Sequence, residues 1–167
     1  MNKDVAMNKK RRLLLFIILL PILTHAPHLL NAQTAVEMDT MLTLDTVSAA
    51  KAARFVLESA DLLPAGLSGA DAEKAAYDMA SSNGWVNVAS GDAVTLKDTA
   101  FLVMKAFDLK GGVMYSLFKN PRYAYREMIY HKLILGRSDQ SMKVSGTRLL
   151  HIIDRTLSYA GNEGDIK

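Results

Sequence analysis

The chain has 167 residues, half of them apolar, and no cysteine. This length and composition are typical of one domain with a buried core, and the lack of cysteine excludes a disulfide framework and a lipid-attachment cysteine. The formal net charge is +3, but the basic residues are unevenly distributed. What the charge implies therefore depends on which segment carries it.

Residues 1–32 have the layout of a secretory signal peptide. Four basic residues (KKRR) precede the apolar run 13–23, and two prolines (one inside the run) and two histidines interrupt the apolar sequence before the small residue Ala32. A membrane-spanning helix needs about 20 mainly apolar residues, and these interruptions disfavour one. We therefore expect cleavage after Ala32, no membrane span in the mature chain, and export to the periplasm or the cell envelope.

Without this leader the chain is nearly neutral. Residues 33–109 hold 5 basic and 11 acidic residues, whereas residues 110–167 hold 10 and 5. The balanced total gives no support for nucleic-acid binding. The contrast between the halves predicts either two solvated faces of opposite sign or a basic surface for an anionic polymer.

Apolar residues recur at helical spacing after the leader, and no stretch shows the alternation of a strand. We expect a linker over 33–45, a helical domain over 46–159 and a flexible tail over 160–167. Caps and breakers predict where the helices begin and end: Ser48 to Pro64, Asp71 to an Asn83-Gly84 cap, Lys97 to Asp108, one helix starting at Pro121, and one capped by Ser145.

Part of the chain matches itself when it is shifted by 48 residues. The segment "AYDMASSNGWV" (76–86) falls on "AYREMIYHKLI" (124–134) without a gap, and further on Leu96 falls on Val144. A second shift, of 49 residues, places Val47 beneath Leu96. The pattern predicts an all-α, compact bundle of short helices, built from two full and one partial helix-loop-helix repeat.

Glu127 and His131 lie four residues apart and would share a helical face. Their counterparts in the matching segment are Met79 and Asn83, so no charged pair belongs to the repeat. The mature chain has one further histidine, His151, whereas a zinc site needs three or four ligands. No nucleophile elbow, phosphate loop or metal motif is present. We expect solvated or capping histidines, no cofactor and no enzymatic activity.

The two-helix unit resembles the S-layer homology (SLH) repeat. The end of that family's first helix is similar to "SNGWV" (82–86) and "HKLILGRSD" (131–139), with Gly84 and Gly136 at its glycine positions. Its second helix is similar to "LKDTAFLVMKAF" (96–107) and "VSGTRLLHIIDR" (144–155). The resemblance covers about residues 46–159 and implies three units about a pseudo-threefold axis in an exported envelope protein.

The Thr-Arg-Ala-Glu motif of that family is missing here. Its arginine binds anionic cell-wall polysaccharide in family members, so its loss matters. The arginine positions are occupied by Ala49, Asp98 and Gly146, and the glutamate positions by Lys51, Ala100 and Arg148. The fold is therefore expected to carry over without the ligand site of the family.

Two functions remain open from the sequence. The first is a non-catalytic envelope module that binds cell-wall polysaccharide or peptidoglycan through basic residues of the second half; the candidates are Arg122, Arg126, Lys132, Arg137 and Arg148. The second is a periplasmic protein-interaction subunit that binds an envelope protein through aromatic residues, which are enriched at interfaces. Its candidates are Tyr115, Phe118, Tyr123, Tyr125 and Tyr130. If they form no contact, Tyr125 is expected in the core and the others half-buried.

Overall fold

The computed structural model describes residues 26–164, with side chains over 35–161. Most of the expected signal peptide, residues 1–25, therefore lies outside the described residues. The chain divides into two units between Met41 and Leu42. No helix among the described residues is long and apolar enough to cross a membrane.

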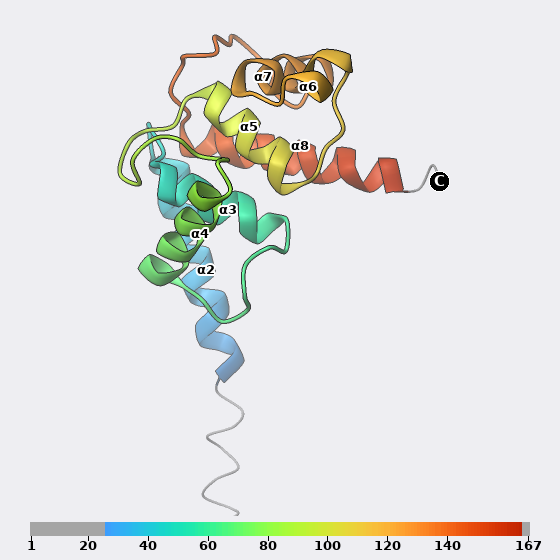
Figure 1. The fold of residues 1–167 in the computed structure, drawn as a ribbon. Coiled ribbons are helices and arrows are strands. Elements are labelled where there is room, and N and C mark those ends of the chain that lie inside the picture. The colour runs from blue at the N-terminus through green and yellow to red at the C-terminus, as the bar shows by residue number, and fades with distance from the viewer. Residues whose placement is uncertain (1–25, 165–167) are drawn as a thin grey trace, which may run out of the picture. The chain divides into compact units, whose positions relative to one another are not determined.

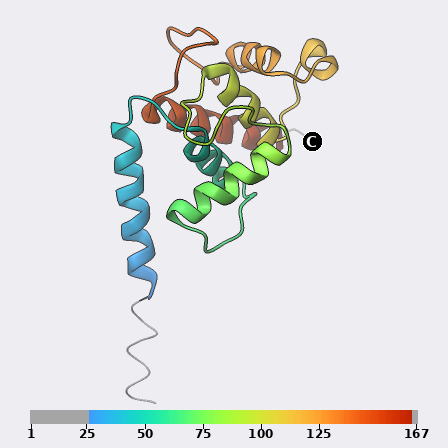
Figure 2. The same ribbon diagram turned by 60° about the vertical axis from the view of Figure 1, so that its left-hand side comes forward.

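The described residues of the first unit, 26–41, all belong to one helix, α2 (Ala26–Thr43), drawn in blue in Figure 2. It includes Ala32, the expected cleavage position, and it makes most of the expected linker 33–45 helical. The linker segment contains alanine, methionine, leucine and glutamate and no glycine or proline, so helix propensity favours this outcome. Cleavage itself stays a prediction.

The second unit, from Leu42 onward, is compact and all-α, which confirms the expected fold class. Within the described residues, extended pairing is limited to isolated bridges that join Ser48 to Ala93 and Thr95 to Lys143. The helices of this unit are α3 (Ala49–Ser59), α4 (Gly69–Ser82), α5 (Leu96–Ala106), α6 (Val113–Leu117), α7 (Pro121–Tyr130) and α8 (Gly146–Gly164).

Three helices form the centre of this unit. α3, α5 and α8 contact one another pairwise, while α4 packs on α3 and α7 packs on α5, so α4 and α7 lie on opposite sides of the central helices (Figure 1). Val56, Leu102 and Ile152, one from each central helix, are almost completely buried. The apolar stripes inferred from spacing thus meet in one core.

A closed cycle of backbone hydrogen bonds joins the segments that precede the central helices. The N–H of Val47 donates to the carbonyl of Val144 (2.9 Å), the N–H of Val144 donates to that of Val94 (3.2 Å), and the N–H of Val94 donates to that of Val47 (3.0 Å). All three valines are buried. Buried backbone groups need such partners, so each segment satisfies a group of its neighbour.

The first helical residues extend this cycle. The N–H groups at the start of a helix have no partner within the helix, and here they donate to a neighbouring segment: Ala49 to the carbonyl of Asp92 (2.8 Å), Leu96 to Met142 (2.9 Å) and Gly146 to Leu44 (2.9 Å). Three repeated units about a pseudo-threefold axis would produce this connectivity. The repeat and its axis stay predictions.

The three central helices also begin with the same cap. Ser48, Thr95 and Ser145 each accept a hydrogen bond from the backbone N–H three residues later, at 3.4, 3.5 and 3.3 Å, so the expected Ser48 and Ser145 caps are confirmed. α5 begins at Leu96, one residue before the expected start at about Lys97. When the central helices are matched by their capping residues, Thr95 corresponds to Ser145 and Val94 to Val144. The shift of 48 residues, which paired Leu96 with Val144, is therefore wrong for this helix.

This cap assignment changes the comparison with the Thr-Arg-Ala-Glu motif in the second unit. Thr95 and Asp98 form a reciprocal capping box, so Asp98 stands at the glutamate position and Leu96 at the arginine position. The sequence comparison placed Asp98 and Ala100 at these two positions, so the cap-based alignment differs from it by two residues. Neither alignment places an arginine at the arginine position of the motif.

Helices α4 and α7 end in the same left-handed turn. Gly84 has φ +68°, as expected for a glycine cap, and Lys132 has φ +57°. The N–H of the following residue donates back into the helix in both cases, from Trp85 to Ala80 and from Leu133 to Met128, each at 2.8 Å. Gly84 and Lys132 thus occupy equivalent turns, as the shift of 48 residues places them. Gly136 also has a positive φ, of +78°.

Helix α8 differs from the other central helices in length. α3 and α5 each have 11 residues, whereas α8 has 19 and reaches Gly164. Positive φ at Asp61 and Asp108 follows the ends of α3 and α5, but no such turn follows in α8. The helix therefore continues beyond residue 159, into the segment expected as a flexible tail.

Replacing Thr99 by valine should stabilise the protein. Its hydroxyl is buried and, among the described residues, has no hydrogen-bond partner, so Thr99→Val should raise the free energy of unfolding by about 1–3 kcal/mol. Urea denaturation measures this. Thr156 is the matched control, because it is equally buried but donates to the carbonyl of Ile152 at 2.8 Å. An equal gain from Thr156→Val would contradict the explanation.

Candidate functional site

Four of the five candidate basic residues are exposed. Arg122 and Arg126 lie one turn apart on α7, and Lys132 and Arg137 lie in the segment that follows it. None of the four forms an ion pair with an acidic side chain in the described part of the chain. They therefore leave positive charge accessible on and beside α7.

Arg148 has a different environment. Its guanidinium donates to the backbone carbonyls of Leu135 (3.2 Å) and Arg137 (3.1 Å) and lies 3.0 Å from the sulfur of Met142. The side chain thus fastens the loop after α7 to the start of α8. Arg148 positions the backbone of Arg137, and its donors are engaged by protein groups rather than directed to solvent.

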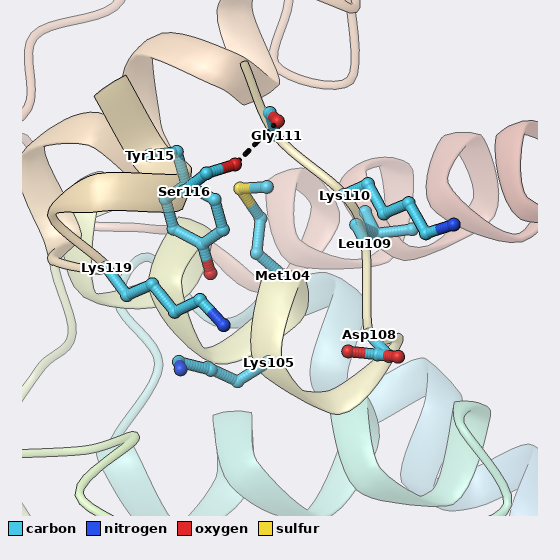
Figure 3. Close-up of a pocket in the computed structure, with 9 residues that line it drawn as sticks. All are labelled: Met104, Lys105, Asp108, Leu109, Lys110, Gly111, Tyr115, Ser116 and Lys119. Carbon is cyan, nitrogen blue, oxygen red and sulfur yellow. Dashed lines mark hydrogen bonds between the residues drawn. The ribbon is translucent and has the colours of Figure 1, made fainter. Parts of the chain in front are cut away.

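The structure also contains a pocket that the sequence analysis did not identify. It has a volume of about 310 Å³ and lies between the end of α5 and α6. Its lining includes three lysines, Lys105, Lys110 and Lys119, together with one acidic residue, Asp108. In Figure 3 the amino groups of Lys105 and Lys119 lie on the same side as the hydroxyl of Tyr115, while that of Lys110 points away.

Tyr115 forms the wall of this pocket. The residue is only 4% exposed, and burial, with a smaller contribution from the Asp108 carboxylate, raises the pKa of its phenol to about 12. The hydroxyl therefore stays protonated at neutral pH and can donate a hydrogen bond to an anion. Two ammonium groups and a neutral donor on one side suit a phosphate or carboxylate group.

Gly111 gives Tyr115 the space it occupies. A Cβ at Gly111 would lie 2.5 Å from Cδ1 of the tyrosine ring, and the Ser116 hydroxyl donates to the Gly111 carbonyl at 3.2 Å. The Gly111-Gly112 pair looks like a plain turn in the sequence. Lys105, Lys110 and Lys119 lie on either side of this pair in the sequence. Their spacing is the sequence feature that could have indicated a site for an anion.

Glu127 and His131 do meet on α7, but as a weak pair. His131 Nε2 lies 3.8 Å from Glu127 Oε2, and His131 is the C-cap residue of the helix, between the rings of Tyr130 and Tyr159. His151 is exposed. The described residues contain no group of three histidine, aspartate or glutamate side chains suited to a metal. Glu127 and His131 also line a small hollow together with Lys110 and Tyr159.

The aromatic residues are arranged differently from the expectation. Tyr115 rather than Tyr125 is the buried one, while Tyr123 and Tyr125 are half-buried. Phe118 and Tyr130 are 54% and 78% exposed. Tertiary packing decides which tyrosine is buried. Tyr115 lies beside α5 in the pocket lining, and its own helix has only five residues, too few to show a periodic pattern in the sequence.

The chain was compared with protein-family models, curated proteins and solved structures, and none of the three comparisons gives a match. The function therefore has to be inferred from the geometry of the described residues and from the sequence.

Replacing Lys132 by glycine should stabilise the fold while removing one positive charge. A left-handed conformation costs a residue with a Cβ about 1–2 kcal/mol, and glycine loses part of that gain through its greater freedom in the unfolded chain. Lys132→Gly should therefore raise the free energy of unfolding by about 1 kcal/mol. Lys132→Ala, which removes the same charge but keeps the strain, is the control; an equal gain from it would rule out the backbone explanation.

Tyr115 should make stability depend on pH in alkaline solution. Its pKa rises from 10.0 to about 12 on folding, so the unfolded chain holds fewer protons between these values and the free energy of unfolding falls as pH rises. Tyr115→Phe should show a smaller fall, measured by urea denaturation across this range. Tyr130→Phe, at an exposed position, should retain the wild-type slope, and indistinguishable slopes for the two variants would refute the assignment.

Proposed function

We propose that the protein is an exported, non-catalytic envelope module, similar to SLH repeats, that binds an anionic cell-wall polymer. The support is an accessible basic surface, defined by Arg122, Arg126, Lys132 and Arg137, on a compact helical unit. These side chains are exposed, and none forms an ion pair with a described acidic side chain. No cofactor or catalytic role is part of the proposal.

The supporting observation is the placement of this surface on two connected elements. Arg122 and Arg126 project from α7, and the loop that carries Arg137 is held by Arg148. A rigid support reduces the entropy lost when a charged side chain binds. A polymer with regularly repeated carboxylate or phosphate groups could engage several of these cations at once, and such multivalent contact compensates for the weakness of each exposed pair.

A second candidate function is protein interaction within the envelope. Its support is the exposure of Phe118 and Tyr130, since an exposed aromatic side chain can anchor an interface. The partner would be an envelope protein. We favour the polymer because the exposed cations are more numerous and none of them forms an ion pair with a described acidic side chain.

The polymer proposal predicts salt-sensitive binding that depends on the basic surface. Changing Arg122, Arg126 and Arg137 together to glutamine should weaken co-sedimentation with purified cell-wall polymer by about tenfold, because each exposed charge contact contributes less than about 1 kcal/mol. Added salt should weaken wild-type binding, since such contacts are screened over about 8 Å at physiological ionic strength.

Two controls separate this proposal from its alternatives. Lys74, Lys97 and Lys143 changed together to glutamine remove the same charge and should leave binding near the wild-type level. Glu127→Gln and His131→Asn should also have no effect. Binding that ignores salt and the arginine changes but is lost with Glu127→Gln or His131→Asn would overturn the proposal, and binding lost on changing Phe118 and Tyr130 would favour a protein partner.

A further inference from the structure

Helix α6 exposes an unusual amount of apolar surface for its length. Val113, Met114, Leu117 and Phe118 are 75%, 46%, 68% and 54% exposed, whereas Tyr115 between them is buried. No other stretch of six residues in the described part of the chain exposes four large apolar side chains to this extent. Contiguous exposed apolar side chains usually mark a binding surface.

Basic residues lie beside this apolar turn. The pocket that α6 closes contains Lys105, Lys110 and Lys119, with Asp108 as the one acidic residue of its lining. The pocket and α6 share Tyr115 and Ser116 (Figure 3). Val113, Met114, Leu117 and Phe118, with the two lysines whose amino groups lie on the side of the Tyr115 hydroxyl, Lys105 and Lys119, are together called the α6 surface.

We propose that the α6 surface binds a membrane containing anionic phospholipids, with its apolar side chains in the interfacial region and its lysines at the lipid phosphates. A bilayer with such lipids presents negative charge next to an apolar interior, and this surface combines exposed apolar side chains with cations that complement both. The Tyr115 hydroxyl, which stays protonated, is placed to donate to a phosphate oxygen between Lys105 and Lys119. The proposal does not rest on polymer binding and uses none of the residues of the basic surface.

Charge complementarity favours a lipid over a protein partner. A protein would have to supply both an apolar groove and acidic side chains in a matching arrangement, whereas an anionic bilayer offers both everywhere on its surface. Neither part of the α6 surface is large, and surface binding generally requires an apolar and an electrostatic contribution together. Removing either should therefore abolish most of the interaction.

A fluorescent reporter on α6 tests the proposal. Because the chain contains no cysteine, Leu117→Cys in the full chain gives one labelling site for an environment-sensitive dye. Vesicles of phosphatidylcholine with phosphatidylglycerol should shift its emission to the blue, while vesicles of phosphatidylcholine alone or inorganic phosphate should not. Leu67→Cys, in the exposed loop before α4, is the control and should show no shift. Residues 1–32 are present in both proteins, so any vesicle affinity of that segment is common to both.

Lysine variants complete the test. Lys105→Gln and Lys119→Gln in the labelled protein should each raise the amount of anionic lipid needed for a half-maximal shift about fivefold, and Lys74→Gln should not. Equal shifts at positions 117 and 67, or an undiminished shift after both lysine changes, would overturn the proposal. A Leu117 reporter that responds to an envelope protein but not to anionic vesicles would overturn it in favour of a protein interface.

Discussion

The second unit depends on the cycle of backbone hydrogen bonds through Val47, Val94 and Val144. These valines precede the three central helices, and their polar backbone groups are removed from water together with their side chains. A buried amide without a partner costs as much as a lost hydrogen bond. Each segment can therefore be buried only when the other two are in place, which couples parts of the chain that are distant in sequence.

This coupling determines where the central helices begin. The serine or threonine after each valine caps its helix, and the first helical N–H reaches the neighbouring segment. The helices consequently start side by side and share one core. α4 packs on the outside of α3, and α7 packs on the outside of α5. The outward side of α7 and the segment after it are therefore exposed to solvent and can hold charged side chains.

The surfaces proposed for binding lie on the solvent-facing sides of their elements, although α7 also buries Ala124 and Met128 in the core. Arg122 and Arg126 project outward from α7, and α6 is a helix of five residues with one buried side chain, Tyr115. Lys132 adopts a conformation that favours glycine. A residue that keeps a strained backbone in an exposed position suggests that its side chain has a use, which agrees with its place in the basic surface.

The sequence by itself determined the helical class, two of the central helix caps, the Gly84 turn and the uneven charge, because these depend on local spacing and on side chains near in sequence. It did not identify Thr95 as the cap of α5, although Thr95 and Asp98 have the spacing of a capping box. It also missed the pocket, whose lysines come from α5, a turn and the segment after α6. Tertiary structure alone decided the pocket and the cycle of backbone hydrogen bonds, because both depend on groups brought together by packing between helices rather than by periodicity within one.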